Sequence, residues 1–156
     1  MAPLTIGVRT AGDRTVVSIR GVVDENVDLS ALAPLTGRVE VDLSGVRRFN
    51  STGVRNWVDA IRPLGDRAQV TFVACSSAVV FQLNMISGFL GRGRLESFFG
   101  PMRCDPCDAE VDHLFLRTEC EDGLPPVRCA TCGRDLELDD DEDQYLLFLR
   151  EPTRLP

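Results

Sequence analysis

Two Cys-x-x-Cys pairs constrain this 156-residue chain more than any other feature. They span Cys104–Cys107 and Cys129–Cys132, with 21 residues between them. A two-residue gap lets a tight turn aim both sulfurs at one tetrahedral ion, and Gly133 suits the positive φ that such a turn needs. The pattern is that of a zinc ribbon, with structural Zn²⁺ held by Cys104, Cys107, Cys129 and Cys132.

Other uses of these cysteines fit less well. Disulfides do not suit the reducing compartment that we expect, and a redox Cys-x-x-Cys motif is expected near a βαβ unit, which leaves a second matched pair unexplained. A catalytic zinc ion keeps an open fourth position, whereas four thiolates close the shell. His113, the only histidine, could replace a ligand, but four cysteines suffice. We expect Cys75 to be a small core residue and Cys120 to lie in a hairpin loop.

The charge is distributed unevenly along the chain. Residues 1–100 hold 11 arginines against 9 acids, residues 101–156 hold 6 arginines against 15 acids, and the formal net charge is −7. An acidic metal module is poorly suited to nucleic acid, because duplex binding draws on Lys and Arg contacts to phosphates. All 17 basic residues are arginines, which excludes a phosphate-loop lysine and a Schiff-base lysine.

Apolar runs in this sequence are short. None approaches the length of a membrane-spanning helix, and the first residues lack the basic and apolar regions of a signal peptide. We therefore expect a cytoplasmic protein without membrane insertion.

The first 100 residues predict an α/β sheet domain, because short β-type runs alternate with helical patterns. A short helix is expected around Leu29–Leu35 and a loop at Ser44–Phe49. Strands are expected near Leu4–Val8, Val16–Ile19, Val39–Leu43, Gln69–Cys75 and Arg94–Phe99.

Two longer helices are expected. Pro63 and Gly65 should end the first, whose core-facing stripe is Val54, Trp57, Val58 and Ile61. The second should begin at Ser76 or Ser77 and run to about Leu90, with one stripe at Val79, Leu83, Ile86 and Leu90. Its other stripe, which could seat the zinc module or face a partner, is Phe81, Met85 and Phe89.

Residues 101–156 are expected to form the small zinc-ribbon β module. His113–Arg117 and Pro125–Arg128 are the expected arms of a hairpin, and Tyr145–Leu149 a further strand. The acidic run Asp139–Asp143 lacks the spaced ligands of a calcium loop, and we interpret it as a solvated turn.

Three motifs of the first part resemble the STAS domain of bacterial anti-sigma factor antagonists. They are the turn Gly21–Asp24, the strand end Val41–Val46 and the segment Phe49–Val54, which opens a helix. The resemblance covers roughly residues 4–100 and implies a STAS-like mixed β-sheet with flanking helices.

In that family a partner anti-sigma factor, itself a serine kinase, phosphorylates a hydroxyl in the loop before the helix. The resemblance implies Thr52 as the acceptor, with Ser51 beside it, although Asn50 replaces the family's usual aspartate. It also implies a non-enzymatic binding protein whose docking surface is Asp24, Glu25, Asn26, Asn50, Ser51, Thr52, Gly53, Val54 and Arg55.

Other functions remain open at this point. The chain could instead be a structural adaptor in a larger assembly, resembling the STAS-like subunits beside transport ATPases, and it could form a homodimer. An enzyme is disfavoured, because a Ser-His-Asp arrangement would have to use His113 inside the zinc module.

Overall fold

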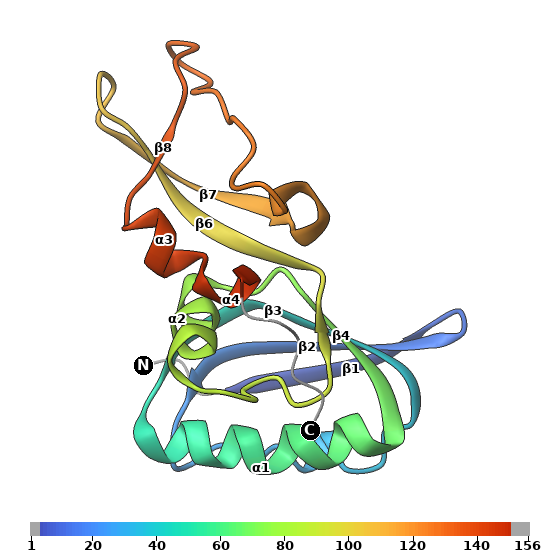
Figure 1. Ribbon diagram of the computed structural model, residues 1–156. Helices are drawn as coiled ribbons and strands as arrows, with labels where there is room; N and C mark the ends of the chain where they lie inside the picture. Colours follow the sequence, from blue (N-terminus) through green and yellow to red (C-terminus); the bar gives the residue numbers. More distant parts are fainter. Residues whose placement is uncertain (1–3, 151–156) are drawn as a thin grey trace.

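The computed structural model describes residues 4–150 and contains two β-sheets (Figure 1). The first is a mixed sheet of five strands in the order β1-β2-β3-β4-β5. β1 runs antiparallel to β2, and the other neighbours are parallel. This confirms the predicted α/β fold class with a mixed sheet. The strands are β1 (Thr5–Ala11), β2 (Arg14–Val23), β3 (Gly37–Phe49), β4 (Ala68–Val73) and β5 (Arg94–Leu95).

Helices flank this sheet and enclose its core. They are α1 (Ser51–Arg67), α2 (Ser77–Met85) and the short 3₁₀ helix η1 (Ser30–Leu32). The Trp57 ring of α1 is fully buried and stacks on Phe89, with ring centroids 5.8 Å apart. Its indole N–H donates to the carbonyl of Phe89 at 2.9 Å, so the largest core side chain has no unpaired polar atom.

Helix α1 is longer than predicted, because Pro63 and Gly65 lie inside it. A proline normally ends a helix by removing one hydrogen bond and crowding the preceding turn. Here the apolar stripe continues past it to Leu64, which is fully buried. The Arg67 guanidinium donates to the carbonyls of Leu32 and Leu35 at 2.7 and 3.0 Å, anchoring the last turn.

The predicted loop Ser44–Phe49 is wrong, because β3 continues to Phe49. β2 extends in parallel with it, as far as the pair Val23–Phe49, through two register shifts. Val46 and Phe49 are buried in the core. Burial of these two side chains therefore outweighs the turn-like composition of the segment.

Helix α2 ends five residues earlier than predicted. Gly88 and Gly91 have φ values of 75° and 59° and reverse the chain, which returns Phe89 to the core beside Trp57. The predicted second stripe is therefore wrong, because its members do not share one face. Phe89 is 1% exposed, whereas Phe81 is 60% and Met85 67% exposed.

The second sheet is antiparallel, with the order β7-β6-β8. Its strands are β6 (Ser97–Cys104), β7 (Ala109–Leu116) and β8 (Glu137–Leu138). The predicted hairpin arms are wrong, because β7 pairs with β6 along its whole length. The predicted boundary between the sheet domain and the zinc-ribbon module, at residues 100 and 101, falls inside β6. Residues 151–156 of the predicted module lie outside the described residues.

Short helices follow these strands: η2 (Arg117–Cys120), α3 (Glu142–Tyr145) and α4 (Leu147–Arg150). Tyr145–Leu149 is therefore helical rather than the predicted strand. The Asp141 carboxylate caps α3 by accepting from Gln144 N at 3.2 Å. This cap lets Tyr145 and Leu146 be buried on one side of a helical turn.

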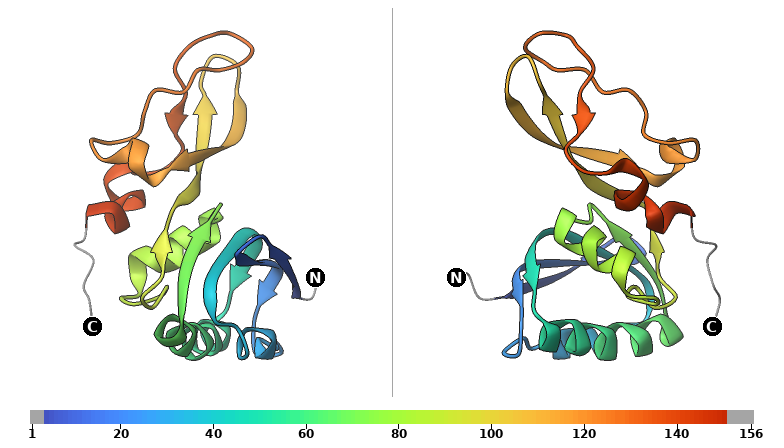
Figure 2. Two further views of the ribbon diagram at one scale, coloured as in Figure 1. Left: turned by 90° about the vertical axis from the view of Figure 1, so that its right-hand side faces the viewer. Right: turned by 60° about the vertical axis from the view of Figure 1, so that its left-hand side comes forward.

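Strand β6 runs from the first sheet into the second (Figure 2), and aromatic side chains pack around its start. Phe98 stacks on Phe115 with centroids 5.7 Å apart and meets Phe148 edge-on at 5.2 Å. The Asn84 amide of α2 donates to Tyr145 O and accepts from Phe148 N, both at 2.9 Å. The C-terminal helices are thus bonded directly to a helix of the first sheet.

No helix within residues 4–150 is long and apolar enough to cross a lipid bilayer.

We predict that Asn84→Ala lowers the free energy of unfolding by about 1–3 kcal/mol, because it leaves two part-buried backbone groups without partners. Urea denaturation followed by circular dichroism measures this change. Gln82→Ala on the same helix is the matched control and should have a smaller effect. Equal effects of both variants would contradict a specific role for the Asn84 amide.

Candidate metal centre and the start of helix α1

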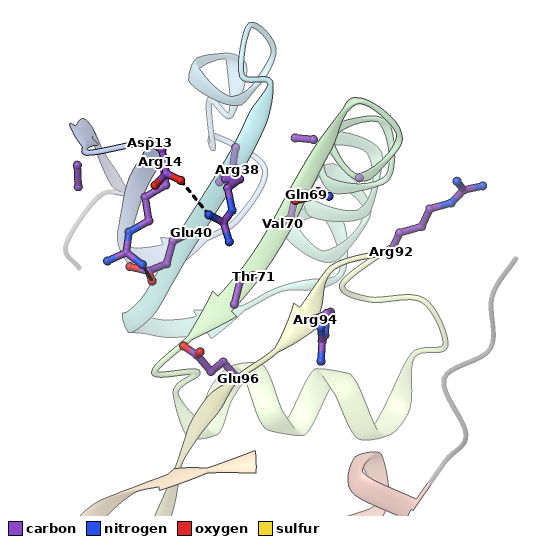
Figure 3. A pocket seen from close by; sticks show the side chains of 14 residues that line it. Asp13, Arg14, Arg38, Glu40, Gln69, Val70, Thr71, Arg92, Arg94 and Glu96 are labelled. Atoms are coloured by element: carbon purple, nitrogen blue, oxygen red, sulfur yellow. Dashed lines mark hydrogen bonds and ion pairs between the residues drawn. The ribbon is translucent and has the colours of Figure 1, made fainter. Parts of the chain in front are cut away.

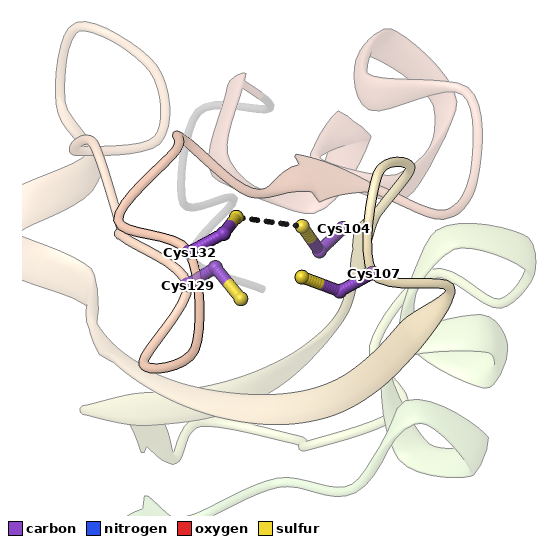
Figure 4. Close-up of side chains that lie close together, drawn as sticks. All are labelled: Cys104, Cys107, Cys129 and Cys132. Carbon is purple, nitrogen blue, oxygen red and sulfur yellow. Dashed lines mark hydrogen bonds between the residues drawn. The ribbon is translucent and has the colours of Figure 1, made fainter.

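Four cysteine sulfurs converge at the far end of the second sheet (Figure 4). The Sγ atoms of Cys104, Cys107, Cys129 and Cys132 all lie within 4.8 Å of one another, and the Cys104–Cys132 separation is 3.5 Å. All four are free thiols. A tetrahedral ion with metal–sulfur bonds of about 2.3 Å needs sulfurs about 3.8 Å apart. The four residues therefore lie close enough to hold one metal ion.

Each cysteine pair sits on a turn that aims its sulfurs inward. After the second pair, Gly133 has a φ of 76° and its N–H donates to Cys129 O at 2.9 Å. After the first pair, Asp108 has a φ of 50°. Aspartate tolerates this left-handed conformation better than most residues do. The sequence predicted the role of Gly133 but not the equivalent role of Asp108. An aspartate, unlike a glycine, does not by itself indicate a residue with positive φ.

The electrostatics of the cluster favour a cation. Backbone N–H groups of Cys132 and Thr131 lower the pKa of Cys129 to about 6. Neighbouring sulfurs of Cys132 and Cys104 raise the pKa of Cys107 to about 12. The first thiolate forms readily, and further ones are opposed by like charge. A bound cation offsets this repulsion, because metal ligation requires deprotonated thiols.

The remaining cysteines and the histidine lie outside the cluster. Cys75 is fully buried, and burial raises the pKa of its thiol. Cys120 ends η2 and donates to Leu116 O at 3.4 Å; burial raises its pKa to about 11. The His113 ring packs against Phe115 with centroids 4.6 Å apart. Among the described residues only the four predicted ligands gather as a possible metal site.

The start of α1 is organised by the side chain of Asn50. Its Oδ1 accepts from Gly53 N at 2.7 Å, which makes Asn50 the N-cap. Its Nδ2 donates to the Glu25 carboxylate at 2.6 Å. The structure therefore brings together two groups of predicted docking residues, in the loop Asp24–Asn26 and the segment Asn50–Arg55. An aspartate at position 50 could cap the helix but could not donate to Glu25.

Gly53 is required by close packing against the end of β2. A Cβ atom added there would lie 1.8 Å from Val23 O. The same carbonyl accepts from Asn50 N at 3.1 Å. The first turn of α1 thus rests directly on the backbone of the neighbouring strand.

The hydroxyl residues of this turn face solvent. Ser51, Thr52 and Arg55 are exposed, whereas Gly53 is buried and Val54 half-buried. A backbone N–H and the Asn50 amide lower the pKa of Glu25 below its usual value. The helix start therefore presents two hydroxyls beside a stabilised carboxylate.

A broad hollow of about 810 Å³ lies on the first sheet, away from both features (Figure 3). Sequence reasoning did not anticipate it, because its lining comes from five separate segments. Two ion pairs lie among its lining residues: Arg38–Asp13 at 2.9 Å and Arg14–Glu40 at 3.2 Å.

Comparisons with known proteins place this chain in no family. No family model matches it, and no curated protein matches it. A solved structure titled "Crystal Structure Analysis of Mglu" is similar at 27% identity, over 41% of this chain and 18% of that chain. The TM-score is 0.35, so this likeness carries no argument about fold or function.

We predict that Gly53→Ala destabilises the protein by about 1–3 kcal/mol, because the added methyl group would overlap Val23 O and force the helix away from β2. Thermal and urea denaturation measure this loss. Gly7→Ala is the matched control, since its added Cβ would meet nothing within 4 Å. Unchanged stability of the Gly53 variant would show that α1 shifts freely at its first turn.

We predict that the purified protein binds one divalent metal ion per chain and that Cys132→Ser lowers its metal affinity. Elemental analysis after dialysis measures the stoichiometry. Cys120→Ala is the control and should retain the ion, because Cys120 lies outside the cluster.

Chelation should unfold the second sheet, since metal binding and folding are coupled in small modules. A chelated protein with an unchanged circular dichroism spectrum would contradict this.

Proposed function

We propose that this protein is a non-enzymatic, cytoplasmic regulatory binding protein that docks on another protein through the loop Asp24–Asn26 and the start of α1. The observation that carries the proposal is the double hydrogen bonding of Asn50, which joins this loop to the helix in one exposed surface. Predominantly polar residues make up the surface, which suits a reversible contact with a protein partner.

The proposed metal is Zn²⁺. Four thiolates at tetrahedral spacing are the ligand set of structural zinc sites, and they leave no open position for a substrate. Soft sulfur ligands also disfavour magnesium and calcium. The ion would hold β6 and the loop before β8 together and so keep the C-terminal helices on α2.

The resemblance to STAS domains suggests that the partner is an anti-sigma factor with serine kinase activity and that Thr52 accepts its phosphate. A phosphate there would add about −1.5 to −2 charges. Free backbone N–H groups at the helix start would favour it, whereas the Glu25 carboxylate would repel it. We expect this repulsion to break the Asn50–Glu25 contact and displace the loop, so that the partner dissociates.

The proposal is tested with an anti-sigma kinase from the same cell, ATP and mass spectrometry of the peptide containing residues 50–55. Phosphate should appear on the wild type and on Ser51→Ala, and be absent from Thr52→Ala. Thr52→Glu should weaken partner binding at least about tenfold, or about 1.4 kcal/mol. The control Thr10→Glu, on exposed β1, should bind normally.

A structural adaptor is the second candidate. The direct bonding of Asn84 to the C-terminal helices favours it, because it presents both sheets as one rigid surface. An adaptor would keep its partner whether or not Thr52 is phosphorylated. Absence of phosphate transfer together with normal binding by Thr52→Glu would therefore remove the switch and leave the adaptor.

A further inference from the structure

Strand β7 forms one edge of the second sheet, whose order is β7-β6-β8. No further strand within residues 4–150 pairs with its outer side. Figure 1 shows this sheet on the far side of the molecule from α1. A strand edge with unpaired backbone groups is a template on which another chain can add a strand. The edge of β7 is therefore a place where a partner can bind through its backbone.

The side chains of β7 alternate between two faces of the sheet. Phe115 belongs to the inner face, where it is fully buried and stacks on Phe98. Leu114 is 45% and Leu116 43% exposed. The side chains of the outer face are all exposed: Glu110, Asp112, Leu114 and Leu116. The outer face of β7 thus carries two carboxylates towards its start and two leucines towards its end.

The carboxylates of this face have no counter-ion within the described part of the chain. Arg103 of β6 lies opposite Glu110 in the sheet, where a cross-strand ion pair is expected. Its guanidinium instead pairs with Asp105 and Asp108 at 3.5 and 3.2 Å. Neither Glu110 nor Asp112 forms an ion pair with any residue of 4–150. The face therefore keeps two negative charges beside its apolar end.

We propose that β7 binds an extended, basic segment of another protein, which adds to the sheet as a further strand. Backbone hydrogen bonds along a strand edge supply affinity, and alternate side chains supply specificity. In an antiparallel pair, apolar side chains of the segment lie beside Leu114 and Leu116. Its Arg or Lys side chains then lie beside Glu110 and Asp112. From its N-terminus the segment reads apolar, any residue, apolar, any residue, basic, any residue, basic.

Charge selects this class of partner over the others. Nucleic acid and anionic lipid headgroups are negative, as the face itself is. A second copy carries −7 overall, and its residues 101–156 hold 15 acids against 6 arginines, so two such modules repel one another. A purely apolar segment would leave the carboxylates without partners as it excluded water from them. A segment with both apolar and basic side chains matches both ends of the face.

This surface and the docking surface at the start of α1 lie on different sheets and share no residue. Loss of binding at one leaves the other intact, so the two proposals can fail separately.

Methyl NMR of the full chain, labelled at its leucine and valine methyl groups, tests the proposal with two synthetic peptides. Val-Thr-Val-Thr-Arg-Thr-Arg has the expected alternation, and its analogue has Glu in place of both Arg. The first peptide should shift the Leu114 and Leu116 signals, with an affinity that falls about tenfold between about 50 and 500 mM salt. The analogue should cause no shift up to about 1 mM. Equal binding of both peptides, or of neither, would overturn the proposal.

Variants of β7 locate the contact on one face. Leu114→Ser should weaken binding of the Arg peptide at least about fivefold, because less apolar surface is covered, and Asp112→Asn about threefold. Val111→Ser is the matched control: Val111 is also 45% exposed on β7 but lies opposite Met102, on the other face. It should bind like the wild type. Equal weakening by Val111→Ser and Leu114→Ser would rule out the outer face.

Amide hydrogen exchange distinguishes strand addition from contact between side chains alone. An added strand gives partners to the free N–H groups along β7, so their exchange should slow at least about tenfold at saturating peptide. Amides of the antiparallel strand β1, the free edge of the first sheet, are the internal control and should not change. Unchanged exchange in β7, or equal protection of β1, would contradict the proposed mode of binding.

Discussion

The strand β6 carries the physical constraint on which the rest of the structure depends. At its start, Phe98 forms a bridge with Cys75, at the end of β4, and its ring packs between Phe115 and Phe148. At its end, Cys104 supplies the first sulfur of the metal cluster. One rigid eight-residue segment therefore connects the core of the first sheet to the metal centre.

A metal ion held by the four cysteines would compensate for the small size of the C-terminal module. Domains of about 50 residues bury too little apolar surface to offset their conformational entropy, and nature stabilises them with metals or disulfides. The cluster closes a loop of some 21 residues between its two turns. The module also takes stability from its neighbour, through the Asn84 amide and the Phe98 ring.

The start of α1 shows how a small polar network can shape a binding surface. Asn50 caps the helix and fixes Glu25, and Gly53 allows the helix to rest on Val23 O. Ser51 and Thr52 are left exposed between these fixed points. The proposed phosphoswitch would act on this network.

The sequence alone determined the features that depend on local spacing. The two Cys-x-x-Cys turns, the start of α2 at Ser76 or Ser77 and the stripe of α1 each need only a few neighbouring residues. Tertiary structure decided the features that depend on distant burial. Helix α1 continues past Pro63 because Leu64 is buried. Strand β3 stays extended because Val46 and Phe49 are buried. Phe89 packs on Trp57 and therefore does not share a face with Phe81 and Met85. In each case burial of apolar side chains in the core outweighed a local helix breaker, a turn-like composition or a local periodicity.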